Sequence, residues 1–273
     1  MRGRDIVMPS AEPTRLTDDL WLAAHDGVKG SCLIGSRPLG VGLAAGLLAE
    51  LVHGRFLELR EGELFRSTGE LPEDPALRPV LVKIEAEERT WLPSAPPASV
   101  RTTARAHEEW GPRASERGWP PPVTEENRHR LRGHQLSVWM AYLAYEQRAE
   151  TRVLDRLSRI GLVRREEHRR LFRGTTARYV PCDSFASGTP ANTITNAVQT
   201  GRTLPWPKVF LAGLFLATGL HHHALATLSP YERSLLTQQI QAGLSDAGKP
   251  GIKAMLRELL RAADAAVGEA AMR

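Results

Sequence analysis

The most regular hydrophobic pattern of the chain lies in residues 38–59, where apolar side chains recur at steps of three and four residues. Apolar residues on most of the circumference predict a helix that is buried on nearly all sides. The glycines and alanines in this stretch would let neighbouring helices approach closely. Gly54 predicts the end of the helix, and residues 55–65 predict a β-hairpin that turns at Glu61 and Gly62. The apolar positions are Val41, Leu43, Ala44, Leu47, Leu48, Leu51 and Val52.

Further segments with helical spacing lie on both sides of this central helix. Near the start of the chain, Thr17 is a favourable N-cap residue, and Asp18 and Asp19 suit the positive end of a helix dipole. The proline-rich residues 93–124 predict a long loop. Additional helices are expected at 72–91, 124–147, 148–161, 193–198, 205–220, 231–244 and 253–267, and strands at 31–34, 162–163 and 171–180, the last two joined through 166–168.

These elements predict a mainly α fold, with a single helical domain around a central hydrophobic helix and β-hairpins at its periphery. The domain is expected to span residues 14–268, with the 93–124 loop inside it and residues 1–13 as a disordered leader. With 42% hydrophobic and 25% charged residues, the composition is typical of a soluble globular protein. No apolar run reaches the roughly 18–20 residues that span a bilayer, and no secretory signal is recognisable. We therefore expect a cytoplasmic protein.

The net charge of +5 and the isoelectric point near 9.5 favour an anionic partner, either nucleic acid or acidic lipid. Basic residues concentrate in residues 148–180, the predicted helix and hairpin. In a winged-helix protein such a helix and wing contact DNA, whereas at a bilayer the same arginines would face acidic headgroups. A solvated basic hairpin without a ligand is the third interpretation. The hairpin arginines are Arg164, Arg165, Arg169, Arg170 and Arg173.

The sequence gives no support to catalysis, a cofactor or a metal site. It contains neither a GxSxG elbow nor a phosphate-binding glycine loop. The three histidines at 221–223 are consecutive, so on a helix their side chains point in different directions and cannot easily share one metal ion. His53 and His134 lie on apolar segments that are predicted as helices, and both are interpreted as packed residues. Cys32 and Cys182 lack CxxC spacing, which predicts two reduced thiols.

The order of these pieces resembles the Golgi phosphoprotein 3 family in its bacterial form. The matching pieces are LTDDLWLAAHD, GLAAGLLAELVHGRFLEL, RVLDRLSRIGLV and VFLAGLFLATGLHHHALATLSPYE, and together they cover roughly residues 14–245. The resemblance implies a mostly helical domain with a central hydrophobic helix. From the eukaryotic members it also implies a peripheral membrane protein that binds phosphatidylinositol 4-phosphate and acts as an adaptor, not as an enzyme.

The resemblance further implies where a lipid site would lie. In the family, a Trp and an Arg near the start of the central helix combine with two Args just before the RLxxLVxxGL-like helix. The corresponding positions of this sequence hold Gly35, Ala44, Gln147 and Glu150. The family's four site residues are therefore all replaced.

Three arginines close to these positions could rebuild an anion site. Arg148 and Arg152 lie on or beside the same helix, and Arg37 could approach from the loop; each would make charge-assisted hydrogen bonds to a lipid phosphate. The leading hypothesis is a non-enzymatic protein, peripherally membrane-associated, that binds anionic phospholipid headgroups. The alternative is a winged-helix-like DNA-binding regulator that uses residues 148–180. A protein–protein adaptor, with the hairpin around Phe56 and Phe65 as its contact surface, is the third hypothesis.

Overall fold

The computed structural model describes residues 15–91, 133–170, 174–245 and 251–271. The expected leader at 1–13, the loop at 93–124 and the first part of the helix expected at 124–147 lie outside the described residues. The elements are α1 (Leu16–Ala23), α2 (Ser36–His53), β1 (Leu57–Arg60), β2 (Glu63–Arg66), α3 (Arg78–Trp91), β3 (His134–Gln135), α5 (Leu136–Ala144), the 3-10 turn η1 (Tyr145–Gln147), α6 (Arg148–Arg159), β4 (Val163–Arg170), β5 (Gly174–Pro181), α7 (Ser184–Gln199), α8 (Trp206–Ala217), α9 (His221–Ala224), α10 (Pro230–Gly243) and α11 (Ile252–Ala271).

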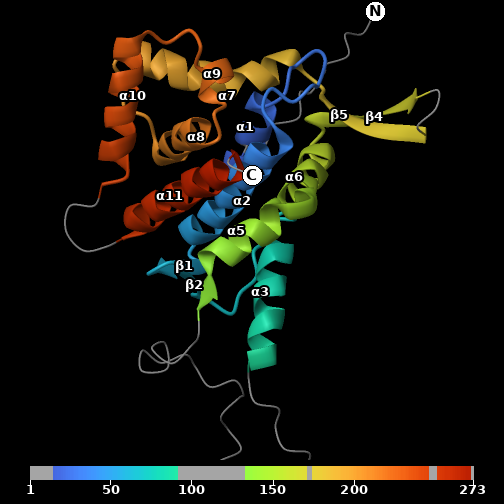
Figure 1. Ribbon diagram of the computed structural model, residues 1–273, viewed down its shortest axis with the longest axis vertical. Helices are drawn as coiled ribbons and strands as arrows, with labels where there is room; N and C mark the ends of the chain where they lie inside the picture. Colours follow the sequence, from blue (N-terminus) through green and yellow to red (C-terminus); the bar gives the residue numbers. More distant parts are fainter. Residues whose placement is uncertain (1–14, 92–132, 171–173, 246–250, 272–273) are drawn as a thin grey trace, which may run out of the picture.

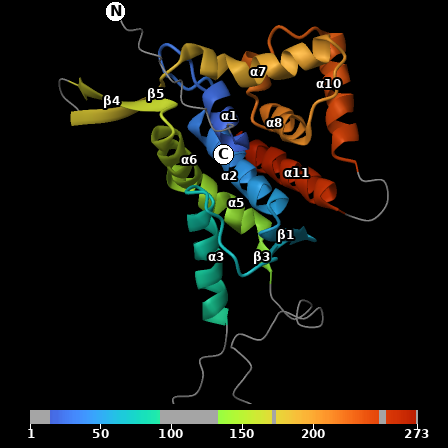
Figure 2. The same cartoon turned by 180° about the vertical axis from the view of Figure 1, so that it is seen from behind.

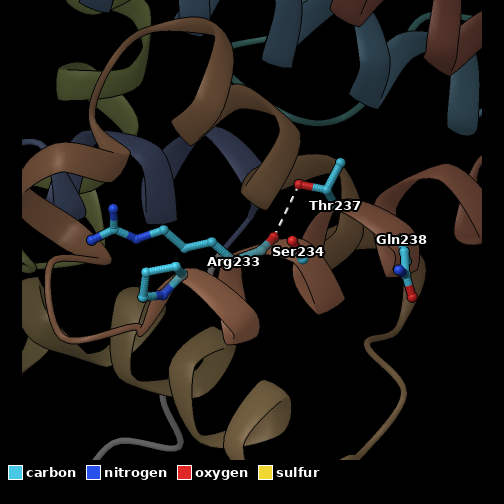
Figure 3. Close-up of a pocket in the computed structure, with 5 residues that line it drawn as sticks. Arg233, Ser234, Thr237 and Gln238 are labelled. Carbon is cyan, nitrogen blue, oxygen red and sulfur yellow. Dashed lines mark hydrogen bonds between the residues drawn. The ribbon is translucent and has the colours of Figure 1, made fainter.

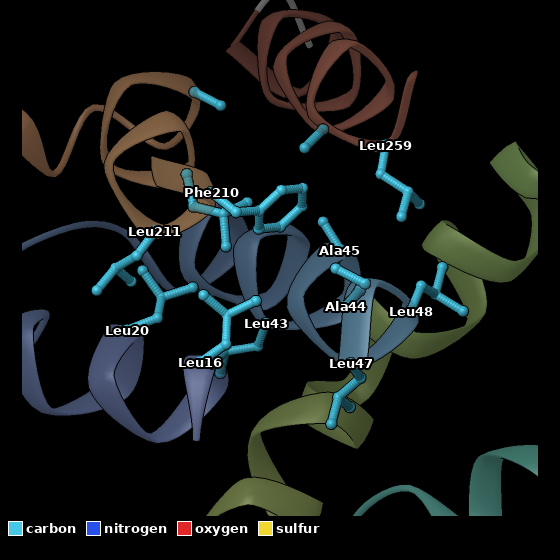
Figure 4. Close-up of a cluster of buried hydrophobic side chains, with 14 of the residues drawn as sticks. Leu16, Leu20, Leu43, Ala44, Ala45, Leu47, Leu48, Phe210, Leu211 and Leu259 are labelled. Atoms are coloured by element: carbon cyan, nitrogen blue, oxygen red, sulfur yellow. The ribbon is translucent and has the colours of Figure 1, made fainter. Parts of the chain in front are cut away.

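The predicted central helix is α2, and the structure confirms a mainly α fold with small antiparallel hairpins at the periphery. Residues 39–49 of α2 are all buried. Figure 4 shows side chains of α1, α8 and α11 converging on the middle of this helix. A Cβ added at Gly46 would lie 2.5 Å from the side chain of Thr17 in α1, and one added at Gly42 would lie 2.7 Å from Thr218. The predicted close approach of neighbouring helices is therefore confirmed.

The helices that surround α2 divide between two sides of the molecule. In Figures 1 and 2, α8, α10 and α11 lie on one side, and α5, α6 and the β4–β5 hairpin lie on the other. β1, β2 and β3 form an antiparallel sheet in that order, with Leu59 opposite Leu64 and Leu64 opposite His134. The hairpin β4–β5 pairs separately, from Val163 with Pro181 to Arg170 with Gly174.

Several boundaries differ from the sequence-based expectations. Residues 31–34 form no strand; they contribute one antiparallel bridge, between Cys32 and His25. Residues 166–168 belong to strand β4, so they do not join the two strands as expected. The helix expected at 193–198 begins at Ser184, because Asp183 accepts a hydrogen bond from the backbone N–H of Phe185 and caps it.

Three other helices also differ from the expectation. The helix expected from residue 72 begins at Arg78, because the Asp74 carboxylate accepts hydrogen bonds from the backbone of Ala76 and Leu77 and holds a turn there. The helix expected at 124–147 has a described part that is divided: strand β3 precedes α5, and a kink follows it. Helix α1 begins at Leu16 with Arg15 as N-cap, so Thr17 lies inside the helix.

The last turn of α3 and the short strand β3 meet through their aromatic side chains. The Trp91 and His134 rings have centroids 4.4 Å apart, and Trp139 Nε1 donates a hydrogen bond of 3.1 Å to His134 Nδ1. His134 is buried. The interpretation of His134 as a packed residue is therefore confirmed.

A buried arginine joins four segments that are distant in the sequence. Arg156 of α6 donates hydrogen bonds to Asp18 of α1 (2.9 Å), to Glu50 of α2 (3.2 Å) and to Asp74 before α3 (3.0 Å). Glu50 also accepts hydrogen bonds from the backbone N–H and the hydroxyl of Thr17. All of these side chains are almost completely buried. No pattern in the sequence indicates this cluster, and Asp18 was expected only to suit a helix dipole.

Burial and charge oppose each other in this cluster. Burial alone would lower the pKa of Arg156, but the charges of Glu50, Asp18 and Asp74 outweigh that effect and raise it. The pKa of Asp18 rises from 3.8 to about 6, because burial outweighs the stabilising charge of Arg156. Arg15, which is half exposed, adds a second cation 2.9 Å from Asp74. The cluster is thus held together by one buried cation that faces three carboxyl groups.

We expect the substitution Arg156→Met to lower the free energy of unfolding by about 3–5 kcal/mol, because it leaves Asp18 and Glu50 buried without a cation and leaves Asp74 with only the half-exposed Arg15. Denaturant unfolding measures the loss. Arg159→Met, an exposed position on the same helix, is the matched control and should change the stability by less than about 0.5 kcal/mol. An equally small loss for Arg156→Met would contradict the role assigned to the cluster.

The raised pKa of Asp18 predicts that its contribution to the free energy of unfolding decreases as the pH rises from 4 to 6. The folded state holds this proton up to a pH of about 6, whereas the unfolded chain releases it near 3.8. The stability contribution is therefore complete below pH 4 and is lost as the pH rises through 6, by about 3 kcal/mol. Relative to Asp18→Asn, the wild type should lose that amount between pH 4 and pH 6 in unfolding titrations. A difference between the two proteins that stays constant with pH would contradict the shift.

The comparison with Asp18→Asn is needed because His25 acts in the opposite direction over the same range. Burial lowers the pKa of His25 from 6.5 to about 4, although its Nδ1 hydrogen-bonds the Trp21 carbonyl. The unfolded chain therefore takes up this proton first, and stability from His25 is lost as the pH falls from 6.5 towards 4. The difference between wild type and variant removes this contribution, since both proteins keep His25.

Candidate anion-binding surface

The three arginines predicted to contact phosphate lie around a kink between α5 and α6. Helix α5 ends at Ala144, and Glu146 and Gln147 follow with φ of 52° and 56°, in the left-handed region. Helix α6 begins at the next residue, Arg148. The kink therefore places Arg148 at the first turn of α6, where the helix dipole favours an anion.

Gly40 brings the first turns of α2 against this kink. A Cβ added at Gly40 would lie only 2.9 Å from the carbonyl oxygen of Ala144. Arg37 is exposed and precedes Gly40 by three residues on α2, one helical turn towards the N-terminus. The first turn of α2, which carries Arg37, therefore lies near the kink that precedes Arg148.

Arg148 is held in place by its own segment. Its Nη1 donates to the Tyr142 carbonyl (3.1 Å), its Nη2 donates to the Glu146 carboxylate (2.9 Å), and its guanidinium lies 4.5 Å from the centre of the Tyr142 ring. The side chain is 34% exposed. These contacts orient the guanidinium before any ligand binds, and part of it still faces solvent.

Arg152 lies one turn further along α6. Its Nη1 donates to the Arg148 carbonyl (2.9 Å), and its buried Nε has no hydrogen-bond partner among the described residues. Gly35, the N-cap of α2, has no side chain that could satisfy the first N–H groups of the helix. The surface formed by Arg37, Arg148 and Arg152, called the arginine surface below, therefore combines cations with donors suited to an anion.

The four positions indicated by the family resemblance do not form such a surface. Ala44 is completely buried in the core, and Gly35 and Gln147 are the N-caps of α2 and α6. Glu150 accepts a hydrogen bond from Trp21 Nε1 (3.2 Å), and burial raises the pKa of its carboxyl group although that bond opposes the shift. A phosphate bound here would therefore depend on the arginine surface.

Two hollows on the described part of the chain lie away from the three predicted arginines. The larger, of about 480 Å³, lies along one helix, α10, where the Thr237 hydroxyl donates to the Arg233 carbonyl (Figure 3). The smaller, of about 270 Å³, lies between the β1–β2 turn and α11. Neither is lined by the predicted arginines, and a hollow formed by one helix face encloses little of a ligand.

Glutamates paired with two of its arginines lower the net positive charge of the β4–β5 hairpin. Arg164 pairs with Glu166 (2.8 Å) and Arg165 with Glu167 (3.6 Å), each two residues along the same strand. The side chains of residues 169, 170 and 173 lie outside the described residues. The exposed side of α6 carries Asp155 beside Arg159. These carboxylates weaken the attraction of the helix and hairpin for any polyanion.

The remaining sequence predictions concern histidines and thiols. His53 stacks on Trp206, with ring centroids 3.8 Å apart, but the residue is exposed, so it contacts one aromatic ring and is not enclosed in the core. Two of the three histidines at 221–223 also contact each other's rings. Among the described residues, no group of His, Cys, Asp and Glu is arranged to hold a metal ion. Cys32 and Cys182 are free thiols.

The tight contact at Gly40 predicts an unusual effect of an alanine. In a helix, Gly→Ala normally stabilises by about 0.5–1 kcal/mol, but at Gly40 the new methyl group would push against the Ala144 backbone. We expect Gly40→Ala to destabilise the fold by about 1–3 kcal/mol in denaturant unfolding. Gly268→Ala, in α11 with nothing within 4 Å, is the matched control and should stabilise. Stabilisation by both would show that the junction is loosely packed.

Comparison with protein families gives one informative match. A family model described as Golgi phosphoprotein 3 (GPP34) matches residues 16–263. The match extends from α1 to α11 and includes all three predicted arginines. A comparison with curated proteins gives no match.

Proposed function

The chain belongs to the Golgi phosphoprotein 3 (GPP34) family, and from this premise we propose that it is a non-enzymatic peripheral membrane protein that binds anionic phospholipid headgroups. Phosphatidylinositol 4-phosphate is the headgroup that the family suggests. The proposed protein is cytoplasmic and associates reversibly with the membrane surface. The observation that supports the proposal is the close approach of Gly40, one turn after Arg37 in α2, to Ala144, which ends α5 just before Arg148 and Arg152 of α6.

The geometry of the arginine surface supports a phosphate ligand. Arg148 is oriented by Tyr142 and Glu146, so little side-chain entropy would be lost on binding. The first turns of α2 and α6 contribute backbone N–H groups with the favourable end of the dipole. No helix of the described chain is long and apolar enough to cross a membrane. Attachment in this proposal therefore depends on surface contacts.

The DNA-binding alternative has less support from the same residues. Helix α6 is followed by a hairpin, as in a winged helix, but the exposed side of α6 carries Asp155, and two of the hairpin arginines pair with glutamates. A recognition helix needs polar side chains that reach base edges without like-charge repulsion from phosphates. We therefore favour lipid, and a duplex-binding assay at low salt distinguishes the two.

The proposal predicts that the variant Arg148→Gln/Arg152→Gln loses affinity for anionic vesicles. Each basic side chain near a charged surface is worth on the order of 1 kcal/mol, so removing two should weaken binding by about 30-fold. Co-sedimentation with phosphatidylcholine vesicles, alone or mixed with phosphatidylserine or phosphatidylinositol 4-phosphate, measures the change. Binding that requires one headgroup and persists at physiological salt would identify a specific site, because diffuse attraction is screened.

The matched control is the double variant Arg202→Gln/Arg233→Gln, which removes the same charge. Both side chains are exposed, and α10, which carries Arg233, lies on the side of the molecule away from α6 (Figures 1 and 2). Equal loss by both double variants would show that only net charge matters. Unchanged binding by the Arg148/Arg152 variant would rule out the arginine surface as the lipid site.

A further inference from the structure

Helix α5 presents an apolar stripe to solvent, directly beside the arginine surface. Val138 and Tyr145 are 58% and 66% exposed, Ala141 is also exposed, and Tyr142 is half-buried. Spacings of three and four residues place Val138, Ala141 and Tyr142 on one side of α5, and Tyr145 is the C-cap residue that follows the helix. The opposite side, with Leu136, Trp139, Met140 and Leu143, is buried against the core.

An apolar outer side distinguishes α5 from its neighbour α6. The outer side of α6 consists of Thr151, Asp155, Ser158 and Arg159, all exposed. A surface helix normally has polar residues on the side away from the core, and a helix that is apolar all round is normally covered. Contiguous exposed apolar residues mark a place where another molecule or a membrane binds.

The charges at the end of the stripe indicate what covers it. The Arg148 guanidinium lies 4.5 Å from the centre of the Tyr142 ring, and Arg37 lies at the same helix junction. The acidic side chain beside them, Glu146, is already paired with Arg148. An apolar stripe that ends in tyrosines and arginines matches the layers of an anionic bilayer, where aromatic rings occupy the headgroup level and cations meet phosphates.

We propose that α5 is a membrane-contact helix: the stripe of Val138, Ala141, Tyr142 and Tyr145 enters the headgroup region of an anionic bilayer beside the arginine surface. This inference rests on the proposed lipid-binding function and adds an apolar contribution to it. The arginines supply attraction that falls with salt, and the stripe supplies attraction that does not. Helix α5 is anchored to α2, α6 and β3 through its inner side, so the stripe is presented on a rigid element.

The test compares two double variants, each of which replaces one valine and one tyrosine by serine. Val138→Ser/Tyr145→Ser removes the ends of the stripe, and Val82→Ser/Tyr231→Ser removes an exposed valine and tyrosine from α3 and α10. All four side chains are exposed, so both variants should fold, which unfolding curves verify. Vesicles of phosphatidylcholine and phosphatidylserine are used at physiological salt and at about 0.5 M NaCl, where the Debye length is only about 4 Å.

We expect the stripe variant to bind about tenfold more weakly than wild type at physiological salt and to lose the binding that remains at high salt. The control variant should match wild type at both. If wild type does not bind anionic vesicles, the lipid-binding function itself is wrong. If wild type binds, Arg148→Gln/Arg152→Gln binds weakly, and the stripe variant binds normally, only the membrane role of α5 is overturned. A dimer of wild type that the stripe variant cannot form would assign the stripe to a second copy of the chain and would also overturn it.

Discussion

The ion cluster around Arg156 is the constraint on which the rest of the structure depends. One guanidinium, buried on α6, satisfies carboxylates from α1, α2 and the turn before α3. Each carboxylate would be costly to bury alone, since an isolated charge in the interior loses its hydration without compensation. The three segments therefore have to meet at α6. The same contact holds α6, the helix that carries Arg148 and Arg152, against α1 and α2.

Sequence patterns predicted what depends on short-range periodicity, and they failed where distant residues decide. The buried helix α2 follows from the spacing of its leucines and alanines, and the fold class follows from similar helices on both sides. The Arg156 cluster has no local signal, because its partners lie 82 to 138 residues away in the sequence. The late start of α3 is one consequence, because Asp74 both holds the preceding turn and binds Arg156.

The candidate site shows the same division. A helix over residues 148–161 was predictable, and with it the placement of Arg148 and Arg152 one turn apart. The kink before that helix was not predictable. Glu146 and Gln147 adopt the left-handed backbone conformation, which usually occurs at glycine, and neither residue is a glycine. The kink brings the Arg148 guanidinium against Tyr142, so the apolar stripe of α5 lies directly beside this arginine. Contact between the α5 stripe and the arginine surface therefore depends on two residues that look unremarkable in the sequence.

The pairing of Trp91 with His134 has a consequence for how the chain can vary. Because α3 ends where β3 begins, the segment that connects them leaves and rejoins the fold at neighbouring points. The entropy of closing a connection between two fixed points grows only with the logarithm of its length, about 0.6 kcal/mol for each doubling. A change in the number of residues between Trp91 and His134 therefore alters the closure entropy by little.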